Sequence, residues 1–190
     1  MLKTYNLTTK EHYELFLEMS HPEVSPYVRN YVADFNEYLK NVTHILAAET
    51  RGEMIVRTIV NEWNQPIGMI SLYDITEYGG FLSTWLGKEY HGKGYNQVAK
   101  QLFLDEVFNE SEVQTIYLKI RTDNYRSQKA VLKLAYVTQV GANYEAMHKM
   151  VNQTGLKYNL YLVSKLSYLA VQRSCEVEYK TEYEETNVFI

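Results

Sequence analysis

Three strand-like segments separated by short turns constrain the fold more than any other part of this sequence. They cover residues 53–60, 67–75 and 81–86, and the residues between them, 61–66 and 78–80, contain the Asn, Gly and Pro of typical turns. Turns this short connect neighbouring antiparallel strands, whereas parallel strands need a long crossover. The middle of the chain is therefore predicted to form a three-stranded antiparallel meander.

Helix and strand patterns alternate on both sides of this meander. Thr8 and Glu11 form a capping box at the start of a helix whose apolar residues recur at helical spacing. A second helix is expected from Val28 through Val42, because its apolar residues fall on one stripe. The other predicted elements are a strand over 2–7, helices over 95–109 and 124–134, and strands over 115–120, 136–140 and 156–163.

The order of these elements, βααβββαβαββ, predicts an α/β (α+β) fold with a mixed, mostly antiparallel central sheet flanked by helices. The two helical crossovers that follow the meander imply parallel neighbours. Residues 1–166 are expected to form this domain. Residues 167–190 are expected to be an acidic C-terminal extension in which Glu alternates with Val and Tyr, which predicts either an extra strand or a solvated acidic end.

Composition and charge narrow the function classes. The chain has 190 residues and a net charge of −4, which argues against nucleic-acid binding through a basic field. No stretch approaches the ~18 apolar residues of a membrane span. The single cysteine, Cys175, permits no internal disulfide and favours a cytoplasmic location. The five histidines lack the spacing of metal ligands, so no metal is expected.

The segment from Trp85 to Gln97 is where chemistry is expected, because a strand, a glycine loop and a helix start follow one another there. A helix start has unpaired N–H groups and a dipole that favours anions. Gly92 and Gly94 allow the backbone to approach an oxyanion closely. The segment therefore indicates phosphate binding, and its alternative is an ordinary strand-to-helix turn. A P-loop is disfavoured, because Gly94 stands where Ser or Thr should hold Mg²⁺.

Four sequence pieces resemble the GCN5-related N-acetyltransferase (GNAT) superfamily, in order over about residues 1–166. One is the pyrophosphate loop, with the pattern Q/R-x-x-G-x-G/A: His91-Gly92-Lys93-Gly94-Tyr95-Asn96. The second is the I-G-x-I strand, represented by Pro66-Ile67-Gly68-Met69-Ile70, and the third is the end of the strand before the loop, Trp85-Leu86-Gly87. The fourth is the N-x-x-S/A…K-L-G-F segment, represented by Asn124-Tyr125-Arg126-Ser127 with Lys133-Leu134-Ala135-Tyr136. Within the superfamily, the chain looks most like the RimJ/RimL-like branch of ribosomal-protein N-terminal acetyltransferases.

This resemblance implies acetyl-CoA as cosubstrate and direct transfer of its acetyl group to an amine, either a protein N-terminus or a small-molecule amine. It implies the following cofactor-binding residues: Trp85, Leu86, His91, Gly92, Lys93, Gly94, Tyr95, Asn96, Asn124 and Ser127. A plain N-cap remains the alternative for Asn124.

The resemblance also bears on catalysis. Ser127 is the implied proton donor to the leaving thiolate, because Val131 occupies the place where many relatives carry a tyrosine. Its alternative is a small residue that admits the cofactor arm. Glu77 is the expected general base, and Asp74 and Glu145 are further candidates for this role. For each of the three, the alternative is a solvated surface carboxylate.

Some residues depart from the family pattern, notably His91, Asn96 and Ala135. A catalytically degenerate CoA-binding module, or a protein-interaction module that uses the 18 tyrosines, is therefore the alternative function. The sequence is also compatible with a homodimer.

Overall fold

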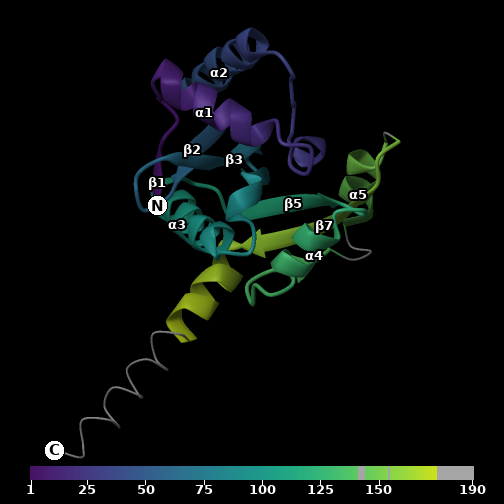
Figure 1. The fold of residues 1–190 in the computed structure, drawn as a ribbon. Coiled ribbons are helices and arrows are strands. Elements are labelled where there is room, and N and C mark those ends of the chain that lie inside the picture. Colours follow the sequence, from purple (N-terminus) through teal and green to yellow (C-terminus); the bar gives the residue numbers. More distant parts are fainter. Residues whose placement is uncertain (141–143, 154, 175–190) are drawn as a thin grey trace, which may run out of the picture. The chain divides into compact units, whose positions relative to one another are not determined.

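Within each of two units of the chain, strands pair antiparallel and helices accompany them (Figure 1). The structure is a computed structural model that describes residues 1–140, 144–153 and 155–174. The units comprise residues 1–113 and 114–190. The predicted fold class, a mixed α/β fold with mostly antiparallel strands flanked by helices, is confirmed.

The first unit contains four strands that pair in the order β1-β2-β3-β4. These are β1 (Leu2–Thr4), β2 (Met54–Val60), β3 (Pro66–Thr76) and β4 (Gly79–Leu86). Strands β2 to β4 are the predicted meander, which is confirmed. A Cβ at Gly68 of β3 would lie 2.3 Å from the Trp85 carbonyl oxygen of β4, which explains the glycine inside this strand.

Helices α1 (Thr9–Met19) and α2 (Phe35–Thr50) pack together on one face of this sheet, with the 3-10 turn η1 (Ser25–Tyr27) between them in the chain (Figure 1). The predicted capping box of α1 is confirmed, because the Glu11 carboxylate accepts the Thr8 N–H at 2.8 Å and the Thr8 hydroxyl accepts the Glu11 N–H. The predicted apolar face of α1 is confirmed by its buried residues: His12, Leu15, Phe16 and Met19.

The helix predicted from Val28 is wrong over its first part, because α2 begins at Phe35. Asp34 is the N-cap, and its carboxylate accepts a backbone N–H of the first turn at 3.0 Å. Asn30 adopts a left-handed φ of 54°, which no right-handed helix tolerates. Three apolar residues still pack against the core from this non-helical segment: Val28, Tyr31 and Val32. Their spacing reflects burial rather than a helix.

Helix α3 (Tyr95–Glu110) packs on the opposite face of the sheet. Successive strand residues point to opposite faces, and in β2 Val56 packs with α1 and α2 whereas Arg57 donates to Glu106 of α3. Arg57 also donates to Glu49 of α2 at 2.7 Å, so one half-buried cation connects both helices to β2.

The core-facing side of α3 agrees only in part with its apolar spacing, which predicts that Val98, Ala99, Leu102, Phe103 and Val107 point inward. Ala99, Phe103 and Val107 are buried, whereas Val98 and Leu102 are 53% and 42% exposed. The buried stripe is rotated by one position relative to them and consists of Ala99, Lys100, Phe103, Leu104, Val107 and Phe108. This stripe contains a cation, and burial lowers the pKa of Lys100 to about 8.

The second unit contains β5 (Thr115–Arg121), β6 (Thr138–Gln139) and β7 (Tyr158–Ser164), with helices α4 (Tyr125–Val131) and α5 (Glu145–Val151). Strand β7 pairs antiparallel with both β5 and β6. The predicted direct parallel pairing across the 124–134 helix is therefore wrong, because β7 lies between the two strands that α4 connects. Helix α5 has no counterpart in the sequence-based prediction.

Residues 165–174 are helical, so the strand predicted from Ser167 is wrong for the described part of the tail. The Ser164 hydroxyl caps this helix by accepting the Ser167 N–H at 3.0 Å. Tyr168 is fully buried and packs edge-on against Tyr136, with ring centroids 5.0 Å apart. Cys175 and the alternating acidic stretch lie outside the described residues, and the boundary at residue 166 stays a prediction.

Candidate functional site

The loop between β4 and α3 carries the residues for which the sequence predicts chemistry. It begins with Gly87, whose N–H donates to the Ile67 carbonyl at 2.8 Å, and continues through the 3-10 turn η2 (Lys88–Tyr90). Lys88 forms an ion pair with Glu23, which precedes η1. The first half of the loop is therefore held by contacts with β3 and with the segment after α1.

His91 closes this first half of the loop. Its Nε2 donates to the Leu86 carbonyl at 3.0 Å, because a carbonyl oxygen can only accept. This Nε2 holds the loop against the end of β4. The cofactor contact that the sequence resemblance implies for the imidazole stays a prediction.

The second half of the loop exposes a run of backbone donors. Gly92 and Gly94 have left-handed φ values of 76° and 86°, which glycine adopts without strain. Gly94 is the N-cap of α3 and offers no side chain to the first turn. Within the described residues, the N–H groups of residues 92–96 have no hydrogen-bond acceptor. We call these five consecutive donors the amide nest, and such a nest at a helix N-terminus favours an anion.

The side chains around the amide nest differ in their surroundings. Lys93 is exposed, with its ammonium 5.9 Å from the Tyr90 ring centroid. The Tyr95 hydroxyl donates to Glu62 at 2.5 Å. The side-chain oxygen of Asn96, Oδ1, is buried and has no donor among the described residues. The nest thus has one exposed cation beside it, and no acidic residue stands in the first turn of α3.

A carboxylate that the sequence analysis did not single out lies at the start of this loop. Glu18, in α1, packs against Gly87 so closely that a Cβ there would lie 2.0 Å from its carboxylate oxygen. Burial, with the nearby charge of Glu89, raises the pKa of Glu18 above its usual value. No local motif marks this residue, because only the packing of α1 brings it to the end of β4.

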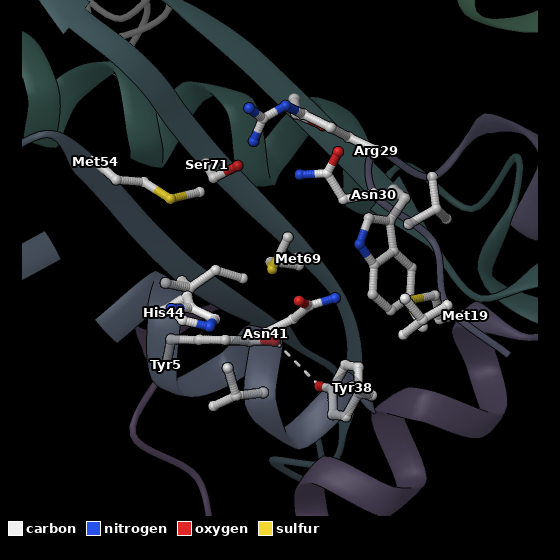
Figure 2. A pocket seen from close by; sticks show the side chains of 16 residues that line it. Tyr5, Met19, Arg29, Asn30, Tyr38, Asn41, His44, Met54, Met69 and Ser71 are labelled. Carbon is white, nitrogen blue, oxygen red and sulfur yellow. Dashed lines mark hydrogen bonds between the residues drawn. The ribbon is translucent and has the colours of Figure 1, made fainter. Parts of the chain in front are cut away.

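Strand β4 also borders a cavity of about 130 Å³ on the α1–α2 side of the sheet (Figure 2). Ser83 and Trp85 of β4 line it, directly opposite Ser71 and Met69 of β3. The polar Ser71 is only 2% exposed, and the buried Trp85 Nε1–H has no acceptor among the described residues. In both strands a serine stands two residues from a large side chain, Met69 and Ser71 in β3 and Ser83 and Trp85 in β4. This alternation is the sequence signal that could have indicated the cavity.

The floor of the cavity contains a buried hydrogen-bonded network. The hydroxyls of Tyr5 and Tyr38 are 3.1 Å apart (Figure 2), and His12 Nδ1 lies 3.2 Å from the Tyr38 hydroxyl. Burial raises the pKa of Tyr5 to about 12 and raises that of Tyr38 further. Burial lowers the pKa of His12. All three groups are therefore neutral near pH 7.

The structure does not bring Glu77 to the amide nest. Glu77 is exposed in the turn between β3 and β4, at the opposite end of β4, where it borders an acidic groove with Glu106 and Glu110. Asp74 is also exposed and lies 3.8 Å from Arg29. These positions favour surface roles for both carboxylates.

The second unit holds the other predicted site residues. Asn124 is the N-cap of α4, and its side-chain oxygen accepts the Ser127 N–H at 3.2 Å. Its amide nitrogen remains a donor. Ser127 is half-buried, Val131 is fully buried, and Glu145 pairs with Lys149 at 2.7 Å in α5.

The described residues contain no group of three or more His, Cys, Asp or Glu side chains that could hold a metal ion. None of their helices combines the length and hydropathy needed to cross a membrane.

A family model described as the acetyltransferase (GNAT) domain matches residues 5–137. The chain therefore belongs to the GNAT acetyltransferase family. No curated protein sequence matches the chain.

Solved structures share its fold. A nucleotide-linked sugar GNAT, apo FdhC, has a TM-score of 0.68 at 15% identity, over 94% of this chain and 92% of its own. Spermidine N-acetyltransferase from Vibrio cholerae, in complex with CoA and spermine, has a TM-score of 0.67 at 14% identity, over 89% of this chain and 97% of its own. The microcin C7 self-immunity acetyltransferase MccE, in complex with acetyl-CoA and AMP, has a TM-score of 0.67 at 17% identity, over 83% of this chain and 88% of its own.

Proposed function

We propose that this protein is an N-acetyltransferase that transfers the acetyl group of acetyl-CoA directly to an amine. The observation that carries the proposal is the amide nest, in which five consecutive N–H groups have no acceptor among the described residues. The transfer forms a carbon–nitrogen bond and breaks the thioester carbon–sulfur bond. The amine loses one proton, and the departing sulfur gains one.

The amide nest fits the pyrophosphate of CoA. A Cβ at Gly92 or Gly94 would meet nothing within 4 Å, so the space in front of both residues is open to a ligand. Lys93 adds a positive charge beside the nest, and Tyr95 and Asn96 supply its last two N–H groups. The main chain of Trp85 and Leu86 is proposed to bind the pantetheine arm, and the thioester supplies the activated acetyl group. The Asn124 amide is proposed as a donor to the same arm.

A base must take the proton of the amine, because an α-amine has a pKa near 8 and a lysine amine near 10.4 in water. Glu18 is better placed for this role than Glu77, since it lies at the β4 end that leads to the amide nest. Its raised pKa also brings it closer to that of the amine it would deprotonate.

The finer assignments rest on the sequence. From the resemblance we infer the RimJ/RimL-like branch and a protein N-terminus or a small-molecule amine as acceptor, and from the single cysteine a cytoplasmic location. The sequence is compatible with a homodimer. The alternative is a catalytically degenerate CoA-binding or protein-interaction module. Release of free CoA thiol with an amine distinguishes the enzyme from such a module.

CoA should raise the melting temperature of the protein, and MgATP should not, because Gly94 offers no hydroxyl to Mg²⁺. Gly94→Ala should weaken CoA binding about tenfold or more, since a left-handed φ disfavours a side chain and distorts the nest. Gly52→Ala is the matched control, because Gly52 has a φ of 73° and equally open surroundings away from the nest. Stabilisation by MgATP without stabilisation by CoA would contradict the proposal.

Glu18→Gln should lower kcat/KM by about 100-fold or more, because it removes the proposed base. In the wild-type enzyme a raised pKa means that activity falls as the pH drops through a value above that of an ordinary glutamate. This acidic limb should be lost in the variant. Glu77→Gln is the control and should change kcat/KM less than about twofold. A large effect of Glu77→Gln with none of Glu18→Gln would reverse the assignment.

Ser127→Ala should lower kcat by about ten- to a hundredfold while CoA affinity changes little, because it removes the proposed hydrogen bond to the leaving sulfur. Ser127→Cys retains a weak donor and should be intermediate. Single-turnover kinetics together with CoA titration separate the two effects. If the alanine variant turns over at the wild-type rate, Ser127 serves only as a small residue.

A further inference from the structure

On the basis of the proposed acetyl transfer, we infer that the acceptor is a small amine that carries an anionic group, such as a carboxylate, and that it binds in the cavity beside β4. This cavity adjoins the amide nest through one strand. The Trp85 side chain lines it, and two residues further along the chain Gly87 begins the loop that leads to the nest.

One unpaired buried donor belongs to a side chain that lines the cavity. The Trp85 indole N–H has no partner among the described residues, and Trp85 is 7% exposed. Ser71, which also lines the cavity, is 2% exposed, and its hydroxyl adds a polar group to the lining. Unpaired buried donors are costly, so a ligand that accepts from them gains affinity.

Arg29 gives the cavity a positive rim. Its guanidinium carbon lies 3.7 Å from the Tyr73 ring centroid, and its distance of 3.8 Å to the Asp74 carboxylate exceeds that of a hydrogen bond. A guanidinium has five N–H donors, so this arrangement retains donors for a further anion. The left-handed backbone at Asn30 fixes the turn that carries both side chains to the cavity.

The same cavity is poorly suited to a polyamine. Among the described residues that line it there is no Asp or Glu, and the carboxylate beside its rim, Asp74, already pairs with Arg29, so a second positive charge on the acceptor would have no lining carboxylate to pair with. Besides the polar groups of Tyr5, Tyr38, Asn41, His44 and Ser83, its lining has an apolar part that includes Met19, Met54, Met69, Val32 and Val42. A small amine with an anionic end and an apolar side chain therefore matches this lining.

An NMR measurement tests occupancy without relying on activity. The chain has two tryptophans, and Trp63 is 72% exposed, so its indole signal serves as an internal reference and Trp63→Phe assigns both signals. CoA-loaded protein is titrated with L-leucine, L-methionine and L-phenylalanine, each paired with its amide, and with O-phosphoethanolamine, ethanolamine and spermidine. At least one amine with an anionic group should shift the Trp85 indole proton, whereas the matched amine without that group, and spermidine, should not.

Kinetics test the charge selection. The wild-type enzyme should prefer the best anionic amine over its neutral partner by about tenfold or more in kcat/KM, and Arg29→Gln should remove most of this preference while CoA affinity stays unchanged. Arg51→Gln is the control, because Arg51 pairs with Glu53 on the surface. Comparison of carboxylates with O-phosphoethanolamine identifies which anion the cavity accepts.

The two tests separate failure of the inference from failure of the proposed function. Equal or better acetylation of spermidine or of the neutral amides, without a Trp85 shift by any anionic amine, would overturn the inference and leave acetyl transfer intact. If no amine is acetylated, the proposed function fails, and the Trp85 signal still decides whether the cavity binds an anionic amine.

Discussion

Two glycines in the left-handed region, Gly92 and Gly94, leave five consecutive N–H groups without an acceptor among the described residues where β4 passes into α3. A residue with a side chain would resist these φ values, and a capping side chain at residue 94 would occupy the donors that a ligand needs. The contacts of Gly87, Lys88 and His91 hold the first half of the loop and so determine where this run of donors begins. The proposed chemistry depends on this backbone arrangement more than on any single side chain.

Strand β4 connects the amide nest to the cavity. Its side chains alternate, so Ser83 and Trp85 reach the cavity while Leu86 and Gly87 continue toward the loop. Pairing with β3 along this strand, including the close approach at Gly68, makes it a rigid support for both places. The proposed donor site for an activated acyl group and the proposed pocket for its acceptor thus share one element of the first unit.

The parts of this structure that local rules determine were predictable from the sequence. The capping box at Thr8, the antiparallel meander and the glycine loop before α3 each depend on residues close together in the chain. The start of α2 at Phe35 is set by the local Asp34 cap, which the apolar spacing from Val28 onward masks. The cavity and the position of Glu18 beside Gly87 depend on contacts between distant segments, which periodicity does not reveal. The hydrogen bond between His91 Nε2 and the Leu86 carbonyl likewise could not be read from the motif, which gives no orientation for the imidazole.

The most direct test of this account is an NMR titration of isotope-labelled protein with CoA, followed through the backbone amides. The account predicts that the amide signals of residues 92–96 shift most strongly, whereas those at the start of α1, where Thr8 and Glu11 already cap the helix, stay in place. Pantetheine, which lacks the pyrophosphate, should leave the signals of residues 92–96 nearly unchanged. Binding of CoA with unchanged amide signals at residues 92–96 would contradict the central claim that this nest holds the pyrophosphate.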